Sequence, residues 1–327
     1  MILAGDIGGT HARLGYFQAQ NGHLKLLSES VFPSREYRGL DEIVVKFVER
    51  EAIQPETACF GIPGPVLHGR AETSNLPWTV EASLIAAELH LPCALLINDL
   101  EANAWGIQDL TEKDFVLLNQ VKTPASGNQA VIAAGTGLGE AGLYWDGRKY
   151  HAFACEGGHG DFAPRNEQEI ELLRYLLARF EHVSYERIVS GPGLVNVYQF
   201  LRDTGRAQEP KWLAEEICGG DPAAAISRAA LSGKSGLAEQ TIDLWISIYG
   251  AEAGNLALKL KATGGVFLGG GIAPKILPKL AGPWFMQSFL SKGRLHALLE
   301  NIPVKVITND NAALIGAARC AVAKSAC

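Results

Sequence analysis

The sequence predicts an α/β protein whose chain forms two related halves. Apolar runs typical of buried strands alternate with amphipathic helical patterns, as in βαβ units that build a mostly parallel sheet. Two segments, residues 5–13 and 133–139, repeat one pattern in which a glycine-rich turn joins two strands. They lie about one domain length apart, so we expect each half to contribute one such hairpin. A length of 327 residues is sufficient for two domains.

The first half is expected to alternate strands and helices from residue 2 onward. A short strand over residues 2–4 leads into the first glycine turn, and apolar runs at 58–62 and 93–97 predict two buried strands. Thr79 is a suitable N-cap for a helix that continues to about His90. An earlier amphipathic helix is indicated by apolar residues at helical spacing, namely Leu40, Ile43, Val44, Phe47 and Val48.

The second half is expected to begin after a connection near residues 107–128. Beyond the second glycine hairpin, Asn166 and Glu169 form the pattern of a helix N-terminal capping box. Pro192 stands at the start of another predicted helix, where a missing N–H costs nothing. Gly264 ends a long helix whose aromatic residues we expect in the core. Its apolar stripe comprises Ile242, Trp245, Ile246, Tyr249, Ala253, Leu256 and Leu260.

The last predicted elements are two strands and a helix. Residues 264–271 have the pattern of a short buried strand with glycine at both ends. The apolar segment 304–307 predicts a further strand, and a final helix is expected to begin near Asn309 and Asp310.

Three glycine-rich segments, at residues 5–10, 135–139 and 264–271, indicate phosphate binding. Glycine lets main-chain N–H groups converge on an anion without obstruction by side chains. The hydroxyl of Thr10 adds a donor, and the carboxylate of Asp6 suits a divalent cation that accompanies the anion. A strand–turn–strand unit of this kind favours nucleotide chemistry.

Two better-known phosphate loops are excluded by single residues. The segment 233–235 resembles the end of a P-loop, but Arg228 stands where the first glycine of that motif is required. The segment that starts at Gly135 begins like a dinucleotide fingerprint, but Glu140 replaces its third glycine. The chain is therefore predicted to be neither a Walker-type NTPase nor a Rossmann dehydrogenase.

Composition and charge indicate the type of protein and exclude some classes of binding partner. Hydrophobic residues make up 47% of the chain and charged residues 20%, as in a globular protein with a sizeable core. The formal net charge is −6 and no basic tract is present, so nucleic acid and anionic membranes are not expected partners. We find no apolar run that could span a bilayer and no pattern of a signal peptide, and expect a cytoplasmic protein.

The six cysteines indicate reduced thiols rather than a disulfide framework. They are scattered and form no CxxC pair. His151, Cys155 and His159 have a spacing of four that would align them for zinc on a helix. Glycines around Gly158 make this stretch a poor helix, so we expect no zinc there.

Polar side chains follow several predicted strands or glycine bends. Asn98 and Asp99 come directly after a strand, at the edge where open α/β sheets bind ligands. The other members of this set are Asn75, Glu156, His159 and Glu186. Carboxylates, amides and an imidazole suit a neutral polyhydroxylated ligand, because each hydrogen bond to a charged group contributes roughly 1.5–3 kcal/mol. Such a site rejects analogues that lack a hydroxyl.

Each of these residues also has a purely structural interpretation. Asn98 and Asp99 could cap a helix. Glu186 could form a solvated ion pair with Arg187, and His159 could be a structural histidine.

Taken in order, the motifs resemble those of the bacterial glucokinases. The resemblance extends from residue 2 to about residue 318 and rests on six segments, at residues 5–10, 98–99, 135–139, 156–159, 186–193 and 269–271. The chain lacks the cysteine-rich zinc motif that is found in the related repressor–kinase group. The resemblance implies the actin/hexokinase/Hsp70 type of fold, with two ribonuclease-H-like α/β domains and an interdomain cleft. The smaller domain would comprise residues 1–108 and 305–327, and the larger one residues 109–304.

The resemblance also implies a function and a set of residues. The expected reaction is phosphorylation of glucose by ATP, with Asp99 as the catalytic base facing the sugar 6-hydroxyl. Asn75, Asn98, Glu156, His159 and Glu186 would bind the sugar. The ATP-contacting residues would be Gly5, Asp6, Ile7, Gly8, Gly9, Thr10, Gly135, Thr136, Gly137, Gly269 and Gly270. Asp6 would hold Mg²⁺ through water, and the family is often dimeric.

The sequence departs from the family pattern at Leu100, Glu101 and Gly160, which affects expectations about sugar affinity. Three other functions remain open. The chain could be a kinase for another hexose or one that uses polyphosphate, a sugar sensor without turnover, or an ATP-driven filament or chaperone on the same scaffold. The retained Asp99 argues against a sensor, and the absence of a peptide-binding domain argues against a chaperone.

Overall fold

The protein is described by a computed structural model that covers residues 1–73, 76–121 and 125–324. The chain divides into two compact units. The first comprises Met1–Asp114, His151–Ala154 and Asn309–Cys327, and the second comprises Phe115–Tyr150 and Cys155–Thr308. Strands and helices alternate in both, which confirms the predicted α/β class.

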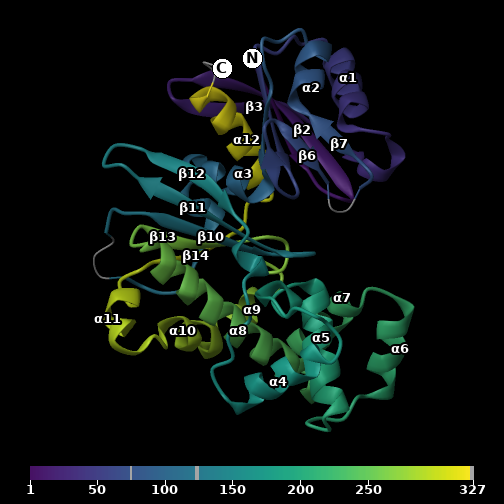
Figure 1. The fold of residues 1–327 in the computed structure, drawn as a ribbon, viewed down its shortest axis with the longest axis vertical. Helices are drawn as coiled ribbons and strands as arrows, with labels where there is room; N and C mark the ends of the chain where they lie inside the picture. Colours follow the sequence, from purple (N-terminus) through teal and green to yellow (C-terminus); the bar gives the residue numbers. More distant parts are fainter. Residues whose placement is uncertain (74–75, 122–124, 325–327) are drawn as a thin grey trace. The chain divides into compact units, whose positions relative to one another are not determined.

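The first unit contains a five-stranded sheet in the order β3-β2-β1-β4-β8 (Figure 1). Its strands are β1 (Ile2–Ile7), β2 (His11–Gln20), β3 (His23–Pro33), β4 (Thr57–Ile62) and β8 (Leu95–Asn98). Strand β2 is antiparallel to both β1 and β3, whereas β1, β4 and β8 run parallel. A separate three-stranded sheet is formed by β5 (Val66–Leu67), β6 (Arg70–Glu72) and β7 (Thr79–Glu81).

Four helices accompany the first sheet: α1 (Leu40–Glu51), α2 (Ala82–Glu88), α3 (Asp99–Gly106) and α12 (Ala312–Ala323). Helix α12 brings the C-terminal part of the chain against α3, β1 and β4. Glycine makes this approach possible, because a Cβ atom at Gly316 would collide with the carbonyl oxygen of Ala102. Residues from both ends of the chain therefore share one core, with Ile2 and Ala4 packed in the same cluster as Leu314 and Ala318.

The strands of the second unit belong to a six-stranded sheet in the order β12-β11-β10-β13-β14-β9, of which only His151–Ala154 of β12 is counted with the first unit. Its strands are β9 (Phe115–Leu117), β10 (Gln129–Ala134), β11 (Leu138–Trp145), β12 (Tyr150–Cys155), β13 (Gly265–Gly269) and β14 (Val304–Ile307). Strands β10 and β11 are antiparallel, and β10, β13 and β14 are parallel. This repeats the arrangement of β1, β2, β4 and β8, which confirms that each half contributes one glycine hairpin.

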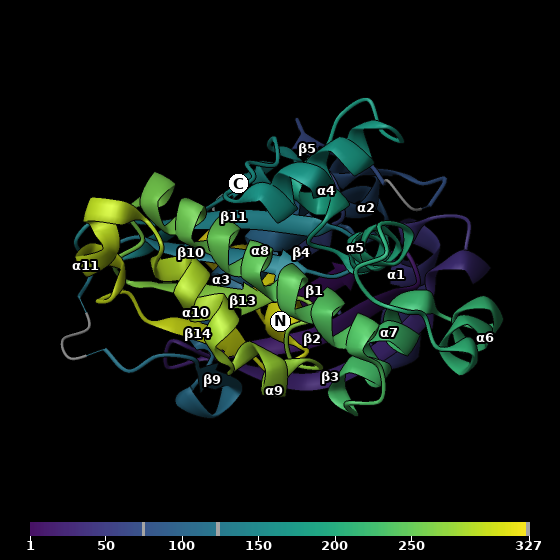
Figure 2. The same cartoon turned by 90° about the horizontal axis from the view of Figure 1, so that it is seen from below.

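Helices form the rest of the second unit. They are α4 (Glu167–Leu177), α5 (Gly191–Asp203), α6 (Lys211–Gly219), α7 (Pro222–Leu231), α8 (Gly236–Leu260), α9 (Leu277–Leu280), α10 (Pro283–Leu290) and α11 (His296–Leu299). Figure 2 shows α8 passing across β10 and β13, and it contacts both strands. Trp245 and Tyr249 of α8 are fully buried, so its aromatic residues are core residues as predicted.

Several predicted boundaries in the first unit were wrong. Strand β1 continues through Gly5, Asp6 and Ile7, because these residues pair with β2, and the turn itself is limited to residues 8–10. Thr79 does not cap a helix: it begins strand β7, where it pairs with Glu72, and α2 begins three residues later. A β-branched residue fits an extended strand well, and the cross-strand pairing outweighs its capping propensity. Strand β8 begins at Leu95 rather than at residue 93.

Two corrections concern the second unit. The expected connection at 107–128 contains strand β9, which pairs with β14 and belongs to the sheet. Helix α8 ends at Leu260 with Lys261 in the left-handed conformation (φ 49°), before Gly264 is reached. The helices α4 and α5 begin where the sequence indicates, since Asn166 accepts a hydrogen bond from the Glu169 N–H and Ser190 caps α5.

Candidate active site

The carboxyl ends of three parallel strands meet at one edge of the first sheet. Asp6 of β1 is in register with Gly61 of β4, and Gly61 is in register with Ile97 of β8. The predicted residues Gly8, Gly9 and Thr10 follow β1, and Asn98 and Asp99 end β8 and begin α3. The structure therefore brings the first predicted phosphate turn and the predicted base to the same sheet edge.

Asn98 anchors the start of α3. Its Oδ1 accepts hydrogen bonds from the N–H groups of Leu100 (2.8 Å) and Glu101 (3.3 Å). Its Nδ2 donates to the carbonyl of Gly64 (3.1 Å), after strand β4. Asn98 is thus a helix cap, the structural alternative for this residue, and it also fixes the loop that follows the neighbouring strand.

Asp99 occupies the first position of α3, where a carboxylate is favoured by the helix dipole. Its Oδ1 accepts a hydrogen bond from the Leu100 N–H at 2.9 Å, and its carbonyl accepts from Asn103 Nδ2 at 3.0 Å. Gly61 lies next to the Asp99 backbone, because a Cβ atom there would be 3.6 Å from the Asp99 Cα and 3.0 Å from the Ala102 Cβ. The glycine lets α3 lie close to β4 and so determines where the Asp99 carboxylate is placed.

Asp6 is a carboxyl group in an unfavourable environment for a charge. Burial raises its pKa from 3.8 to about 6, although Arg13 lowers the pKa in part. Arg13 is the residue opposite Asp6 on β2, but its guanidinium donates to the Asp310 carbonyl at 3.1 Å and to Asn311 Oδ1. A half-buried carboxyl group whose nearby cation binds other acceptors is suited to a second positive charge, such as a metal ion with its water shell.

The glycine turn after β1 is held by Ser34. Its Oγ donates to the carbonyl of Gly8 at 2.8 Å, and its N–H donates to the carbonyl of Thr10 at 3.0 Å. The N–H of Gly8 donates to the carbonyl of His11, which closes the turn. Thr10 itself is exposed, so its hydroxyl is available to a ligand.

The second sheet brings two glycine turns together at its own carboxyl edge. Ala133 is in register with Gly269, so the turn at residues 135–137 lies beside the turn that follows β13. Gly270 has φ 79°, and a Cβ atom at this position would collide with the carbonyl oxygen of Ala134. Gly270 is therefore required by both its conformation and its surroundings.

The N-terminus of α5 also reaches this edge, which the sequence did not predict. The N–H of Gly191 donates to the carbonyl of Gly135 at 2.8 Å. The Ser190 hydroxyl accepts from the N–H of Gly193 at 3.0 Å and donates to the carbonyl of Glu186 at 2.7 Å. A helix N-terminus next to a glycine turn favours an anion, because both present N–H groups.

Glu186, His159 and Glu156 lie together in the second unit. Glu186 Oε2 accepts a hydrogen bond from the N–H of Leu138 at 3.0 Å, directly after the Gly135–Gly137 turn. Its Oε1 lies 4.0 Å from His159 Nδ1. Glu156 is exposed and precedes the short 3-10 helix Gly157–His159, where its carbonyl accepts from the His159 N–H. Two carboxylates and an imidazole thus face solvent around one glycine bend.

The remaining sequence-based expectations concern an ion pair of Arg187, the position of Asn75 and a possible zinc site. Arg187 stacks on Phe180, with 4.4 Å from its guanidinium carbon to the ring centroid, so it is directed away from an ion pair with Glu186. Asn75 lies outside the described residues. His151 and Cys155 belong to strand β12 and His159 to a 3-10 helix, so the three do not share the helix that a zinc site would require. Within the described part of the chain, no group of three or more potential metal ligands converges.

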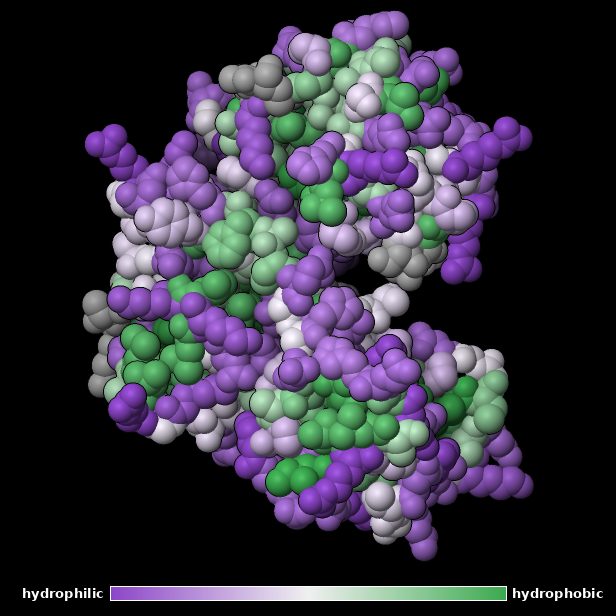
Figure 3. Space-filling view, viewed as in Figure 1, coloured by the Kyte–Doolittle hydropathy of each residue, from purple (hydrophilic) through white to green (hydrophobic). Residues whose placement is uncertain are grey.

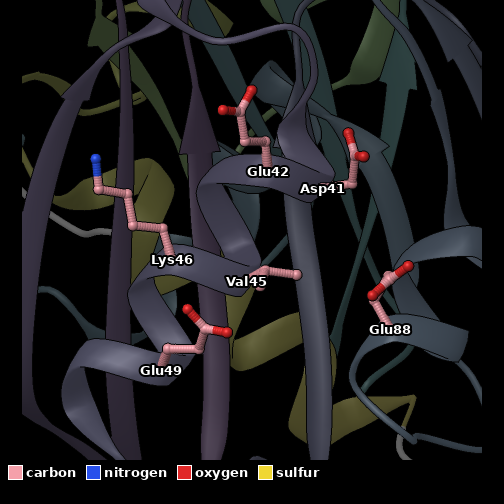
Figure 4. Close-up of a pocket in the computed structure, with 6 residues that line it drawn as sticks. All are labelled: Asp41, Glu42, Val45, Lys46, Glu49 and Glu88. Atoms are coloured by element: carbon pink, nitrogen blue, oxygen red, sulfur yellow. The ribbon is translucent and has the colours of Figure 1, made fainter.

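A groove between α1 and α2 is separate from these residues (Figure 4). It has a volume of about 440 Å³ and is lined by Asp41, Glu42, Val45, Lys46, Glu49 and Glu88. None of the predicted site residues lines it. Elsewhere, the face shown in Figure 3 carries hydrophilic residues between separate apolar patches. No helix of the described chain is both long enough and apolar enough to cross a lipid bilayer.

Comparison with known proteins identifies the same family as the sequence motifs. The family model described as glucokinase matches residues 3–324. A glucokinase from Trichormus variabilis is 44% identical over 98% of this chain and 98% of its own length. The crystal structure of a glucokinase from an Antarctic psychrotroph has a TM-score of 0.86 at 30% identity, and covers 99% of each chain.

A more distant solved structure shares the fold. This is a ROK family glucokinase from Streptomyces griseus, crystallised with glucose and AMPPNP, which has a TM-score of 0.65 at 22% identity over 98% of this chain and 99% of its own. The family model covers nearly the whole chain, and the curated relative exceeds 40% identity over almost its full length. This chain therefore belongs to the glucokinase family.

Proposed function

We propose that this protein transfers the γ-phosphoryl group of ATP to the 6-hydroxyl of glucose. Membership of the glucokinase family carries this proposal, since the match covers residues 3–324. The observation that supports it in the structure is the sharing of one sheet edge by Asp99 and the glycine turn after β1. A base for an alcohol and a turn for a phosphate are the two groups that phosphoryl transfer to a hydroxyl requires.

Asp99 would orient the sugar hydroxyl and accept its proton late in the reaction. The transition state of phosphoryl transfer is loose, so the hydroxyl needs alignment more than early deprotonation. A positioned base contributes roughly 10²–10⁴-fold to the rate. The larger share would come from alignment of the two substrates and from stabilisation of charge on the transferring group.

Glucose would be bound by Asn75, Asn98, Glu156, His159 and Glu186 as well as Asp99. A carboxylate can accept hydrogen bonds from two neighbouring hydroxyls, and Glu156 is exposed and able to do so. His159 is also exposed, and its imidazole can form one hydrogen bond through each ring nitrogen. In Asn98, Oδ1 and one hydrogen of Nδ2 already bond to protein groups and hold the Gly64 loop, which leaves the second Nδ2 hydrogen to donate to a sugar oxygen.

The phosphates of ATP would contact the turns at Gly8–Thr10 and Gly135–Gly137, and Gly269 and Gly270 would lie near the adenosine. The N-terminus of α5 adds N–H groups beside the second turn. Asp6 fits a magnesium ion, because burial has raised its pKa to about 6 and a nearby cation would restore the charged form. Bound Mg²⁺ neutralises charge on the β- and γ-phosphates.

The proposal assigns residues of both units to one substrate pair, and so it requires two ribonuclease-H-like domains that close on the sugar. These domains would correspond to the two compact units, so that β14 belongs with the larger domain rather than with residues 1–108. Closure would exclude water and so limit hydrolysis of ATP. Small-angle scattering would show compaction on addition of glucose, and an unchanged radius of gyration would contradict this part of the proposal.

The decisive test is a coupled assay for glucose 6-phosphate with purified protein, ATP, Mg²⁺ and glucose. A panel of hexoses and of donors, including polyphosphate, compared by kcat/KM distinguishes a glucokinase from a kinase of another sugar. Glucose binding without turnover would instead identify a sensor. The family resemblance also implies a cytoplasmic homodimer, and light scattering would measure the number of subunits.

A further inference from the structure

The glycine bend that carries Glu156 and His159 rests on a buried carboxyl group, Glu140 of β11. Glu140 is 1% exposed, and a Cβ atom at Gly157 would collide with its Oε2. Two residues earlier on the same face of β11, the carbonyl of Leu138 occupies the space that a Cβ atom at Gly158 would need. The backbone of the bend therefore packs directly onto β11, with the Glu140 carboxyl beneath Gly157.

Glu140 faces a second buried carboxyl group, Glu252 of α8. Glu252 is 0% exposed, and it lies near enough to Glu140 for its charge to raise the pKa of the Glu140 carboxyl group. A carboxylate has no donor, so a hydrogen bond between two carboxyl groups requires one proton. The Oε1 atom of Glu140 has no hydrogen-bond partner within residues 1–73, 76–121 and 125–324.

Glu252 connects the pair to the segment that carries Glu186. It accepts hydrogen bonds from Asn255 Nδ2 at 2.7 Å and from Lys259 Nζ at 3.1 Å, and Asn255 Nδ2 also donates to the hydroxyl of Tyr185 at 3.1 Å. Tyr185 directly precedes Glu186, and its N–H donates to the carbonyl of Gly160 at 3.0 Å. The two carboxyl groups therefore lie under both segments that carry the predicted sugar ligands.

Building on the proposed function, we infer that Glu140 and Glu252 share one proton, and that this protonated pair positions the Glu156–His159 segment for glucose. Glu140 is a positioning residue in this scheme, because it supports Gly157 and does not reach the sugar itself. Loss of the shared proton would place two carboxylates against each other in a dry interior. Their repulsion would displace Glu140 from Gly157 and loosen the bend.

The charges around the pair support a proton at neutral pH. Burial and the facing Glu252 raise the pKa of Glu140 to about 8, while Lys259 lowers it only in part. The other titratable groups that face Glu140 are Tyr249 of α8 and Cys155 at the end of β12, and burial raises the pKa of each. Lys292 belongs to the same network through Asn255, and burial lowers its pKa to about 8. Glu140 and Lys292 of this network are thus both expected to titrate just above neutral pH.

The experiment compares wild type with Glu140→Gln and Glu252→Gln between pH 6 and pH 9. In wild type, the glucose KM should rise above pH 8 by up to about tenfold per pH unit, with kcat little changed. Glutamine at position 140 keeps the shape and supplies a permanent donor to Glu252. The KM of Glu140→Gln should therefore stay within about twofold of wild type at pH 7 and remain flat to pH 9. Glu252→Gln should also be flat, and serves if the first variant does not fold.

Infrared spectroscopy provides a readout that does not depend on activity. Wild type at pH 7 should show the band of a protonated carboxyl group, and Glu140→Gln should lose it. The matched control is Glu169→Gln, because Glu169 is equally buried but is paired with Arg165 as a carboxylate. This variant should retain both the band and the alkaline rise in KM.

The possible results separate the two proposals. A KM that rises equally in Glu140→Gln would assign the titration to Lys292 or another group and overturn the inference. Absence of the carboxyl band in wild type would also overturn it. If wild type neither binds nor phosphorylates glucose, the proposed function fails, and the infrared experiment still decides whether the pair shares a proton.

Discussion

The two glycine hairpins have the same topology but carry different chemistry. In the first, Asp6 and Arg13 are opposite each other across β1 and β2. In the second, the corresponding position next to the turn pairs Ala133 with Gly139. One turn is therefore flanked by charged groups, and the other offers main-chain N–H groups with Glu186 supplied from a distant segment.

This difference suggests a division of labour between the two sheets. The first sheet edge holds the acids that would handle the metal ion and the proton, Asp6 and Asp99. The second sheet edge holds bare glycine turns, and its acids, Glu156 and Glu186, would bind the sugar. Substitutions at the first edge should therefore reduce turnover, and substitutions at the second should change substrate affinity.

The largest effect is expected for Asp99→Asn. Loss of the base should reduce kcat by roughly 10²–10⁴-fold, while the glucose KM changes only a few-fold. Steady-state kinetics at saturating ATP would measure both. Turnover within a few-fold of wild type would reject Asp99 as the base and remove the main distinction between the two edges.

Gly270→Ala should be the most damaging change at the second edge. Its φ of 79° and the nearby carbonyl of Ala134 both oppose a side chain. We expect a loss of about 1–3 kcal/mol in the free energy of unfolding from strain alone, with an increase in the KM of ATP. Gly22→Ala is the matched control, because Gly22 has φ 81° and no atom within 4 Å of its Cβ position. An equal loss in the two variants would show that the contact with Ala134 is unimportant.

Asp6→Asn should stabilise the metal-free protein in a pH-dependent manner. The pKa of Asp6 is raised from 3.8 to about 6 in the folded state, so folding is penalised progressively as pH rises through this range. The variant should be more stable than wild type by up to about 3 kcal/mol at pH 7, with no gain below pH 4. Denaturant unfolding at both pH values would measure this. The same variant should require more Mg²⁺ for activity, and a gain that is independent of pH would contradict the assignment.

The smallest effect is expected for Glu186→Gln. The remaining amide oxygen can still accept the hydrogen bond from the Leu138 N–H, so the fold should persist. Loss of the charge should weaken glucose binding by about tenfold, which corresponds to about 1.4 kcal/mol. An unchanged glucose KM with reduced kcat would place Glu186 with Asp99 rather than with the binding residues.

Sequence patterns predicted the parts of the fold that depend on local signals. The amphipathic pattern of α1, the capping box of α4 and the strand of residues 58–62 all appear at or within one residue of the expected place. Thr79 was misassigned because its pairing partner Glu72 lies on a separate strand, and register with a partner strand leaves no trace in local spacing. Strand β9 was missed for the same reason, since its partner β14 is almost two hundred residues away.

The sequence predicted those residues of the candidate site that lie in recognisable motifs at the ends of strands. Asp99 and Glu186 were found because glycines or strand ends mark their positions. The contributions of Gly191, Gly61 and Glu140 were not, because each depends on a contact with a residue that is not its neighbour in the sequence. In the sequence, Glu140 is notable only because it replaces a glycine of the dinucleotide-binding motif. Its contact with Gly157 becomes visible only in the folded chain.

The return of α12 to the first unit has a consequence for biosynthesis. The cluster that contains Ile2 and Ala4 also requires Leu314 and Ala318, so it cannot be completed while the C-terminal segment is still inside the ribosome. The second unit ends at Thr308 and leaves the exit tunnel earlier. The N-terminal strands would thus remain partly exposed until helix α12 has been translated, and chaperones that bind nascent chains would be needed most at these strands.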